Sequence, residues 1–140
     1  MAELYRVQRD VESSPMALHP SLLFRYGQLL MLLKRPAPAL AAFQAVTRAD
    51  PRHSRAWSCI GILLAAREEF EPAIDAFEHA AALSPAEAAA HFNLAFLLQR
   101  ADRHGEAIAR FERALEIDPR LERARQGRER SLRIKAALEA

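Results

Sequence analysis

Residues 54–87 read SRAWSCIGILLAAREEFEPAIDAFEHAAALSPAE, and the pattern of apolar residues in this stretch decides the fold. From Trp57 to Leu64, apolar residues recur at intervals of three and four, which is typical of one face of an α-helix. A second apolar stripe of the same kind runs from Ala73 to Ala81, after a polar break. The stretch therefore predicts two helices joined by a turn.

This helix pair occurs three times in the chain, at an interval of 34 residues. Pro51, Pro85 and Pro119 end the three units, because the residue before a proline is disfavoured in a helix. The other columns in register are Phe43, Phe77 and Phe111; Ala39, Ala73 and Ala107; Leu40, Ile74 and Ile108; Gly27, Gly61 and Ala95; and Leu30, Leu64 and Leu98. Chance does not produce so many aligned columns, so the chain carries an internal repeat.

The repeat resembles the tetratricopeptide repeat, a 34-residue helix–turn–helix unit. The second unit matches that pattern column by column at Trp57, Ile60, Gly61, Leu64, Ala73, Phe77 and Pro85. The first unit has Leu23 in the tryptophan column, and the third has His91, which we interpret as a packed structural histidine. The resemblance covers residues 20–121 and implies an all-α, right-handed solenoid in which the first helix of each unit lines the concave side.

The repeat divides the chain into an arm, three units and a cap. Residues 1–19 are expected to form an N-terminal arm or a short lead helix. The units are expected at residues 20–53, 54–87 and 88–121, and residues 122–140 are expected to form a basic helix that caps the third unit. The apolar residues expected to pack in that cap are Leu121, Ala124, Leu132 and Leu138. Gly127 weakens such a helix by about 1 kcal/mol relative to alanine.

The charge is concentrated at the C-terminal end. The 140 residues carry 20 basic and 18 acidic side chains, a net charge of +2. Residues 120–140 hold 7 basic and 3 acidic side chains, a net of +4, and residues 1–119 hold 13 and 15, a net of −2. A basic segment attracts nucleic acid or an acidic partner. Because no aromatic residue lies in this segment to stack on bases, we interpret it as a solvated helix face.

Catalytic and metal-binding patterns are missing from the sequence. No two of its five histidines are three or four residues apart, the single Cys59 forms no disulfide within the chain, and there is no glycine-rich phosphate loop. We therefore expect no enzyme activity, no metal and no cofactor. The absence of a long apolar run and of a signal-peptide pattern predicts a cytoplasmic protein with no membrane partner.

The first helix of each unit supplies the candidate partner site implied by the resemblance. The candidate groove residues are Phe24, Arg25, Gln28, Arg55, Ser58, Cys59, Ile62, Phe92, Asn93 and Phe96. Four of them are large and apolar: Phe24, Ile62, Phe92 and Phe96. Either they are exposed to a partner, as interaction sites often are, or they pack against neighbouring helices or the N-terminal arm.

Some family members hold the acidic tails of heat-shock chaperones with a clamp of Lys, Asn, Asn, Lys and Arg. The matching positions here are Phe24, Gln28, Cys59, Ala89 and Asn93. None of them is a cation, and a carboxylate without its cation is poorly stabilised. We therefore expect no binding of a heat-shock tail.

These observations favour a non-enzymatic interaction module that binds a peptide or helix of a partner protein with an apolar segment. A small dedicated chaperone is the alternative, since the size and layout resemble the translocator chaperones of bacterial secretion systems. Binding of nucleic acid or an anionic surface through the segment from Arg120 to Lys135 is less favoured. A homo-oligomer remains open.

Overall fold

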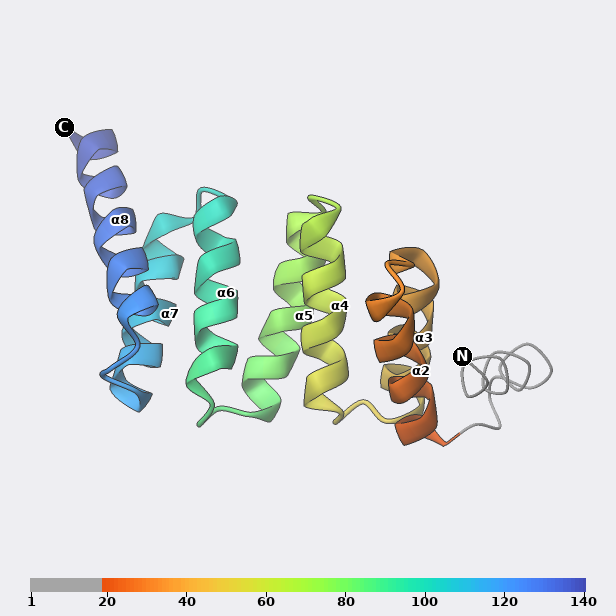
Figure 1. Cartoon of the computed structure of the whole chain (residues 1–140). Helices are drawn as coiled ribbons and strands as arrows, with labels where there is room; N and C mark the ends of the chain where they lie inside the picture. Colours follow the sequence, from red (N-terminus) through yellow and green to blue (C-terminus); the bar gives the residue numbers. More distant parts are fainter. Residues whose placement is uncertain (1–18) are drawn as a thin grey trace.

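The computed structural model describes residues 19–140 as a row of helices (Figure 1). The helices are α2 (Pro20–Leu32), α3 (Pro36–Ala49), α4 (Ser54–Ala66), α5 (Phe70–Leu83), α6 (Ala88–Arg100), α7 (His104–Ile117) and α8 (Glu122–Glu139). This described part contains no strand, and none of its helices is long and apolar enough to cross a membrane. The expected all-α solenoid is confirmed. An arm or lead helix was expected at residues 1–19, and residues 1–18 of it lie outside the described residues.

The helices form two layers. Helices α2, α4 and α6 pack antiparallel on α3, α5 and α7 respectively, and α3, α5 and α7 each pack on the helix that follows. In Figure 1, α2, α4 and α6 stand in front and α8 closes the row. We call the side lined by α2, α4, α6 and α8 the first-helix face.

Small residues let the two helices of a unit approach closely. A Cβ on Gly27 would lie 2.7 Å from the ring of Phe43, and one on Gly61 would lie 2.8 Å from the ring of Phe77. The Phe111 ring instead lies against Gly127 of α8, where a Cβ would overlap it still more closely. The glycine that weakens α8 is therefore required by the packing of α8 on α7.

The tryptophan column holds a repeated hydrogen bond. Trp57 Nε1 donates to the carbonyl oxygen of Pro51 at 2.8 Å, and His91 Nε2 lies 2.9 Å from the carbonyl of Pro85. One unit further on, Arg125 donates to the carbonyl of Pro119 at 3.1 Å. His91 is buried, as predicted, and its Nδ1 lies 3.2 Å from an Arg110 nitrogen. These partners assign His91 as the neutral tautomer, with Nε2 protonated and Nδ1 accepting.

The turns inside the three units share one backbone geometry. Lys34, Glu68 and Asp102, again 34 residues apart, have φ values of 56°, 59° and 61°. The next amide in each turn donates back to a carbonyl near the end of the first helix, for example from Glu69 to Leu64 at 3.0 Å. This is the left-handed helix ending that glycine normally provides, so each unit closes its turn without the residue best suited to it.

The cap differs from expectation at its far end. Ala124 is fully buried and Leu121 packs against the core, but the exposed fractions of Leu132 and Leu138 are 46% and 76%. The prediction that these two leucines pack on the third unit is wrong. Figure 1 shows the C-terminal end of α8 extending past α7.

Candidate functional site

The first-helix face is hollowed where neighbouring first helices meet. The α2–α4 hollow is lined by Arg25, Gln28, Leu29, Met31, Leu32 and Cys59. The α4–α6 hollow is lined by Ile62, Ala65, Ala66, Phe77, Asn93, Phe96, Leu97 and Arg100. Two adjoining depressions make the α6–α8 hollow, lined by Phe92, Phe96, Gln99, Arg100, Asp102, His104, Phe111, Arg123, Gln126, Gly127, Arg130 and Ile134.

The structure distributes the candidate groove residues over these hollows. Arg25, Gln28 and Cys59 line the α2–α4 hollow. Ile62, Asn93 and Phe96 line the α4–α6 hollow, and Phe92 and Phe96 line the α6–α8 hollow. Arg55, Ser58 and Phe24 line none of them.

Phe24 is a core residue. Its exposed fraction is 7%, and its ring centroid lies 5.5 Å from that of Phe43 and 4.7 Å from that of His53. The guanidinium of Arg55 lies 5.1 Å from the ring centroid and covers it. The large apolar candidates were expected either to be exposed to a partner or to pack against neighbouring helices. Phe24 packs, because α2 directs this side chain toward the contact with the segment that begins α4.

Two of the four large apolar candidate residues are exposed on the first-helix face. The exposed fractions of Ile62 and Phe96 are 47% and 44%, and both line the α4–α6 hollow. Phe92 is half-buried, with its ring centroid 6.0 Å from that of Phe111 and the Arg123 guanidinium 5.0 Å away. Among the four apolar candidates, the exposed pair is thus Ile62 with Phe96, and the Phe92 ring stacks beside Phe96 with the centroids 6.3 Å apart.

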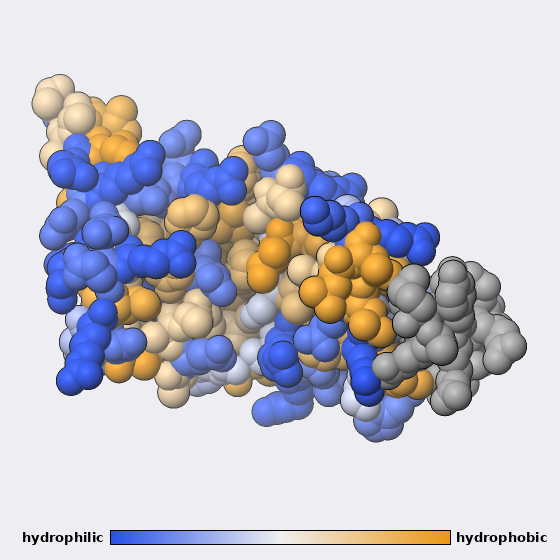
Figure 2. Space-filling view, viewed as in Figure 1, coloured by the Kyte–Doolittle hydropathy of each residue, from blue (hydrophilic) through white to orange (hydrophobic). Residues whose placement is uncertain are grey.

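The two ends of the face differ in polarity. In Figure 2 the largest apolar area lies at the α2 end, whereas the α8 end is mostly hydrophilic apart from the tip of the helix. Sequence reasoning missed Leu32, which is 78% exposed, and Arg100, and it assigned Arg123 and Arg130 to a solvated helix face and not to a hollow. The spacing of Arg123, Gly127, Arg130 and Ile134 was the available signal, since these residues share one helical stripe.

The thiol of Cys59 is poorly suited to nucleophilic chemistry. Burial raises the pKa of the Cys59 thiol above its usual range, and the Arg55 charge opposes that shift without reversing it. Because the thiolate is the reactive form, a raised pKa leaves the group less reactive at neutral pH.

Three polar side chains between α6, α7 and α8 stand in the order of a nucleophile, a base and an acid. Ser131 Oγ lies 3.2 Å from His104 Nδ1, and His104 Nε2 lies 3.6 Å from Asp102 Oδ1. Ser131 is fully buried and also accepts a hydrogen bond from Gln99 at 2.9 Å, so no substrate reaches its hydroxyl. The cluster holds α8 against the third unit.

Among residues 19–140, no group of three or more His, Cys, Asp or Glu side chains is arranged to hold a metal ion.

Solved structures share the architecture of this chain. MamA has a TM-score of 0.86 at 22% identity, covering 95% of this chain and 77% of that chain. YrrB, described as a TPR protein with an unusual peptide-binding site, has a TM-score of 0.78 at 18% identity, covering 90% of this chain and 64% of that chain. The first TPR of RPAP3 (Spaghetti), bound to the HSP90 peptide SRMEEVD, has a TM-score of 0.78 at 18% identity, covering 84% and 93%. At these identities the likeness establishes the fold.

Family models match the sequence over the whole repeat region. One tetratricopeptide repeat model matches residues 20–53 and another matches residues 52–120. The comparison with curated proteins gave no match. Because both family models and the helix pairs agree, this chain belongs to the tetratricopeptide repeat family.

Proposed function

We propose that the first-helix face binds a segment of a partner protein and that the chain works as a non-enzymatic interaction module. The observation that carries this proposal is the exposed pair Ile62 and Phe96 in one hollow of that face. Burying a large apolar side chain against a partner contributes about 1.5–3 kcal/mol. Two structures of the same fold, YrrB and RPAP3, are described with a peptide-binding site and a bound peptide respectively, which supports the same use here.

The proposed site does not have the chemistry of the heat-shock clamp. Of the matching positions, Phe24 is buried, and Gln28, Cys59, Ala89 and Asn93 carry no positive charge. We infer that a free C-terminal carboxylate finds no paired cation there. A micromolar affinity for the peptide SRMEEVD that is abolished by Gln28→Ala would contradict this inference.

A charge placed in the α4–α6 hollow tests the proposal. In the Ile62→Glu, Phe96→Glu double variant, two carboxylates replace the apolar anchor, and a bound partner is expected to be lost. The measurement is capture of partners on the immobilised protein from extract of its own source cells. Leu132→Glu with Leu138→Glu is the matched control, because these leucines are also exposed but line none of the hollows described.

The controls separate the possible results. Circular dichroism must show that both double variants remain helical. A partner kept by the control and lost by Ile62→Glu, Phe96→Glu supports the first-helix face as the site. A partner kept equally by both variants places the site elsewhere and contradicts the proposal. Retention of the chain itself as the partner, with a doubled mass in solution, assigns the face to a homodimer instead.

A further inference from the structure

Three arginines of the α6–α8 hollow have no carboxylate partner in the part of the chain that the structure describes. Arg100, Arg123 and Arg130 are exposed and line the hollow. Within residues 19–140, none of the three forms an ion pair with a carboxylate. Arg123 and Arg130 line one depression of the hollow, and Arg100 and Arg130 line the other. The Arg100 guanidinium also lies 5.4 Å from the ring centroid of Phe70. An anion in the hollow is attracted by the positive charges that line it.

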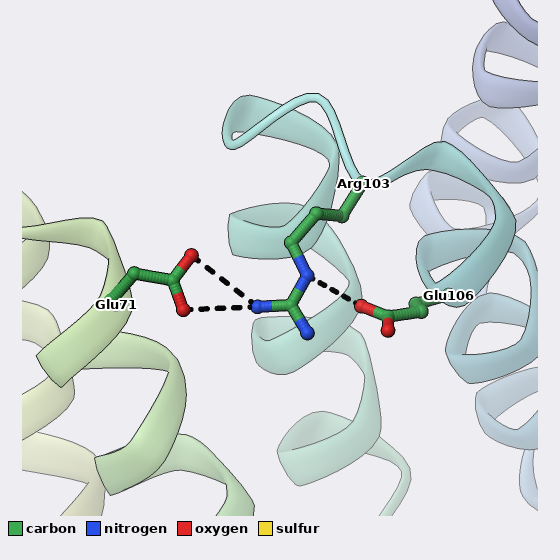
Figure 3. A network of polar contacts seen from close by, with 3 residues as sticks. All are labelled: Glu71, Arg103 and Glu106. Carbon is green, nitrogen blue, oxygen red and sulfur yellow. Dashed lines mark hydrogen bonds and ion pairs between the residues drawn. The ribbon is translucent and has the colours of Figure 1, made fainter.

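Three other arginines in this part of the chain, Arg103, Arg113 and Arg125, pair with glutamates. Figure 3 shows Arg103 held between Glu71 of α5 and Glu106 of α7, at 3.1 Å and 2.5 Å. Arg113 and Arg125 likewise pair with a glutamate three residues further on or back, at 2.9 Å and 2.6 Å. Arg120, Arg128 and Arg133 also form no ion pair among residues 19–140. What distinguishes Arg100, Arg123 and Arg130 is that they line one hollow together with the rings of Phe92 and Phe96. The carboxylate that lines the hollow, Asp102, is directed to His104 at 3.6 Å.

Apolar surface adjoins these charges. Phe96 is 44% exposed and its ring centroid lies 6.3 Å from that of Phe92. The guanidinium of Arg123 lies 5.0 Å from the Phe92 ring centroid, so cation and aromatic face already meet in the hollow. A ligand that matches both features carries negative charges and an apolar side chain close to one another. An extended peptide segment has this chemistry and is narrow enough to lie between two helices.

We propose that the α6–α8 hollow takes an acidic segment of the partner protein. Its Asp and Glu side chains pair with Arg100, Arg123 and Arg130, and one apolar side chain lies against Phe92 and Phe96. This inference rests on the proposed function and names the chemistry of the partner. The apolar floor and the confined set of three cations favour a peptide over nucleic acid, whose phosphates need a broader basic surface. Outside the hollow, α8 carries the basic residues Arg125, Arg128, Arg133 and Lys135 and the acidic residues Glu122, Glu129 and Glu139.

Matched peptides test this proposal on the full chain. The probe is a short fluorescein-labelled peptide, amidated at its C-terminus, in which Asp and Glu alternate with Leu and Phe. Two companion peptides carry Ser or Lys at the acidic positions. Fluorescence anisotropy is expected to show the acidic peptide binding at least about tenfold more tightly than the serine peptide, with an affinity that falls as salt rises.

Two charge-reversal variants locate the site. Arg123→Glu with Arg130→Glu is expected to weaken binding of the acidic peptide about tenfold or more. Arg120→Glu with Lys135→Glu is the control: it changes the net charge equally and involves exposed side chains that line neither part of the hollow. It is expected to leave the affinity within about twofold, as distant screened charges do. Circular dichroism checks that both variants keep their helices.

Every other outcome overturns the inference. Equal binding of the three peptides, or no binding of the acidic one, removes the acidic partner. Equal weakening of peptide binding by both charge-reversal variants would mean that binding depends on the net charge of the protein and not on the hollow. Tighter binding of a DNA duplex than of the acidic peptide, lost in Arg123→Glu, Arg130→Glu, assigns the hollow to nucleic acid. Loss of peptide binding in Ile62→Glu, Phe96→Glu but not in Arg123→Glu, Arg130→Glu refutes this inference while the proposed function stands.

Discussion

Single residues decide how each turn closes, and one of them carries avoidable strain. Glu68 adopts a left-handed conformation, with φ at 59°, which costs a residue with a Cβ about 1 kcal/mol. It is exposed, and no hydrogen bond or ion pair of its side chain contributes to the fold. Glu68→Gly is therefore expected to raise the free energy of unfolding by about 0.5–1 kcal/mol in urea titrations. Glu68→Ala keeps the strain and is the control, so an equal gain in that variant would refute the backbone explanation.

At the same scale, the sequence shows which residues repeat more clearly than what they contact. Register alone placed His91 in the tryptophan column and predicted a packed histidine, because a repeated position meets a repeated environment. The shared donation to the proline carbonyls by Trp57, His91 and Arg125 was not predictable, since three different side chains make it. Burial of Phe24 was equally out of reach, because it depends on the rotation of α2 and on its cover by Arg55.

At the scale of the elements, the packing of α8 on α7 depends on Gly127, which has no Cβ and so leaves room for the Phe111 ring. Gly127→Ala raises the helix propensity of α8 by about 1 kcal/mol, but its Cβ would overlap the ring of Phe111. The ring is fully buried and has little room to move, so we expect a net loss of about 1–3 kcal/mol of unfolding free energy. Gly105→Ala in α7 is the matched control. Its Cβ meets only the Lys135 amine at 3.9 Å, so that variant is expected to be neutral or stabilising in the same titration. A stabilising Gly127→Ala would contradict the role given to the ring.

The elements were the most predictable level of this structure. Apolar spacing of three and four predicted helix pairs, and the structure begins α2, α4, α6 and α8 at intervals of 34 residues. The exposure of Leu132 and Leu138 was not predictable in the same way, because it depends on how α8 is rotated against α7 and on how far it extends past that helix. The uncompensated arginines of the α6–α8 hollow also became visible only once the direction of each α8 stripe was known.

For the whole molecule, the linear order of contacts predicts how instability spreads. Each helix packs mainly on its neighbours in the row, so stability in such a solenoid is a sum of units and nearest-neighbour interfaces. Removal of residues 122–140 uncovers Phe111 and Ala114 and takes away the Ser131 partner of Gln99 and His104. Hydrogen exchange is expected to show faster exchange in α6 and α7, with protection in α2 and α3 nearly unchanged. Removal of residues 136–140 alone, which lie beyond those contacts and are exposed, is the control and is expected to change no helix of the first two units. An equal loss of protection from α2 to α7 would mean instead that the seven helices unfold as one cooperative unit. A change that destabilises one hollow of the first-helix face would then destabilise the helices around all of them.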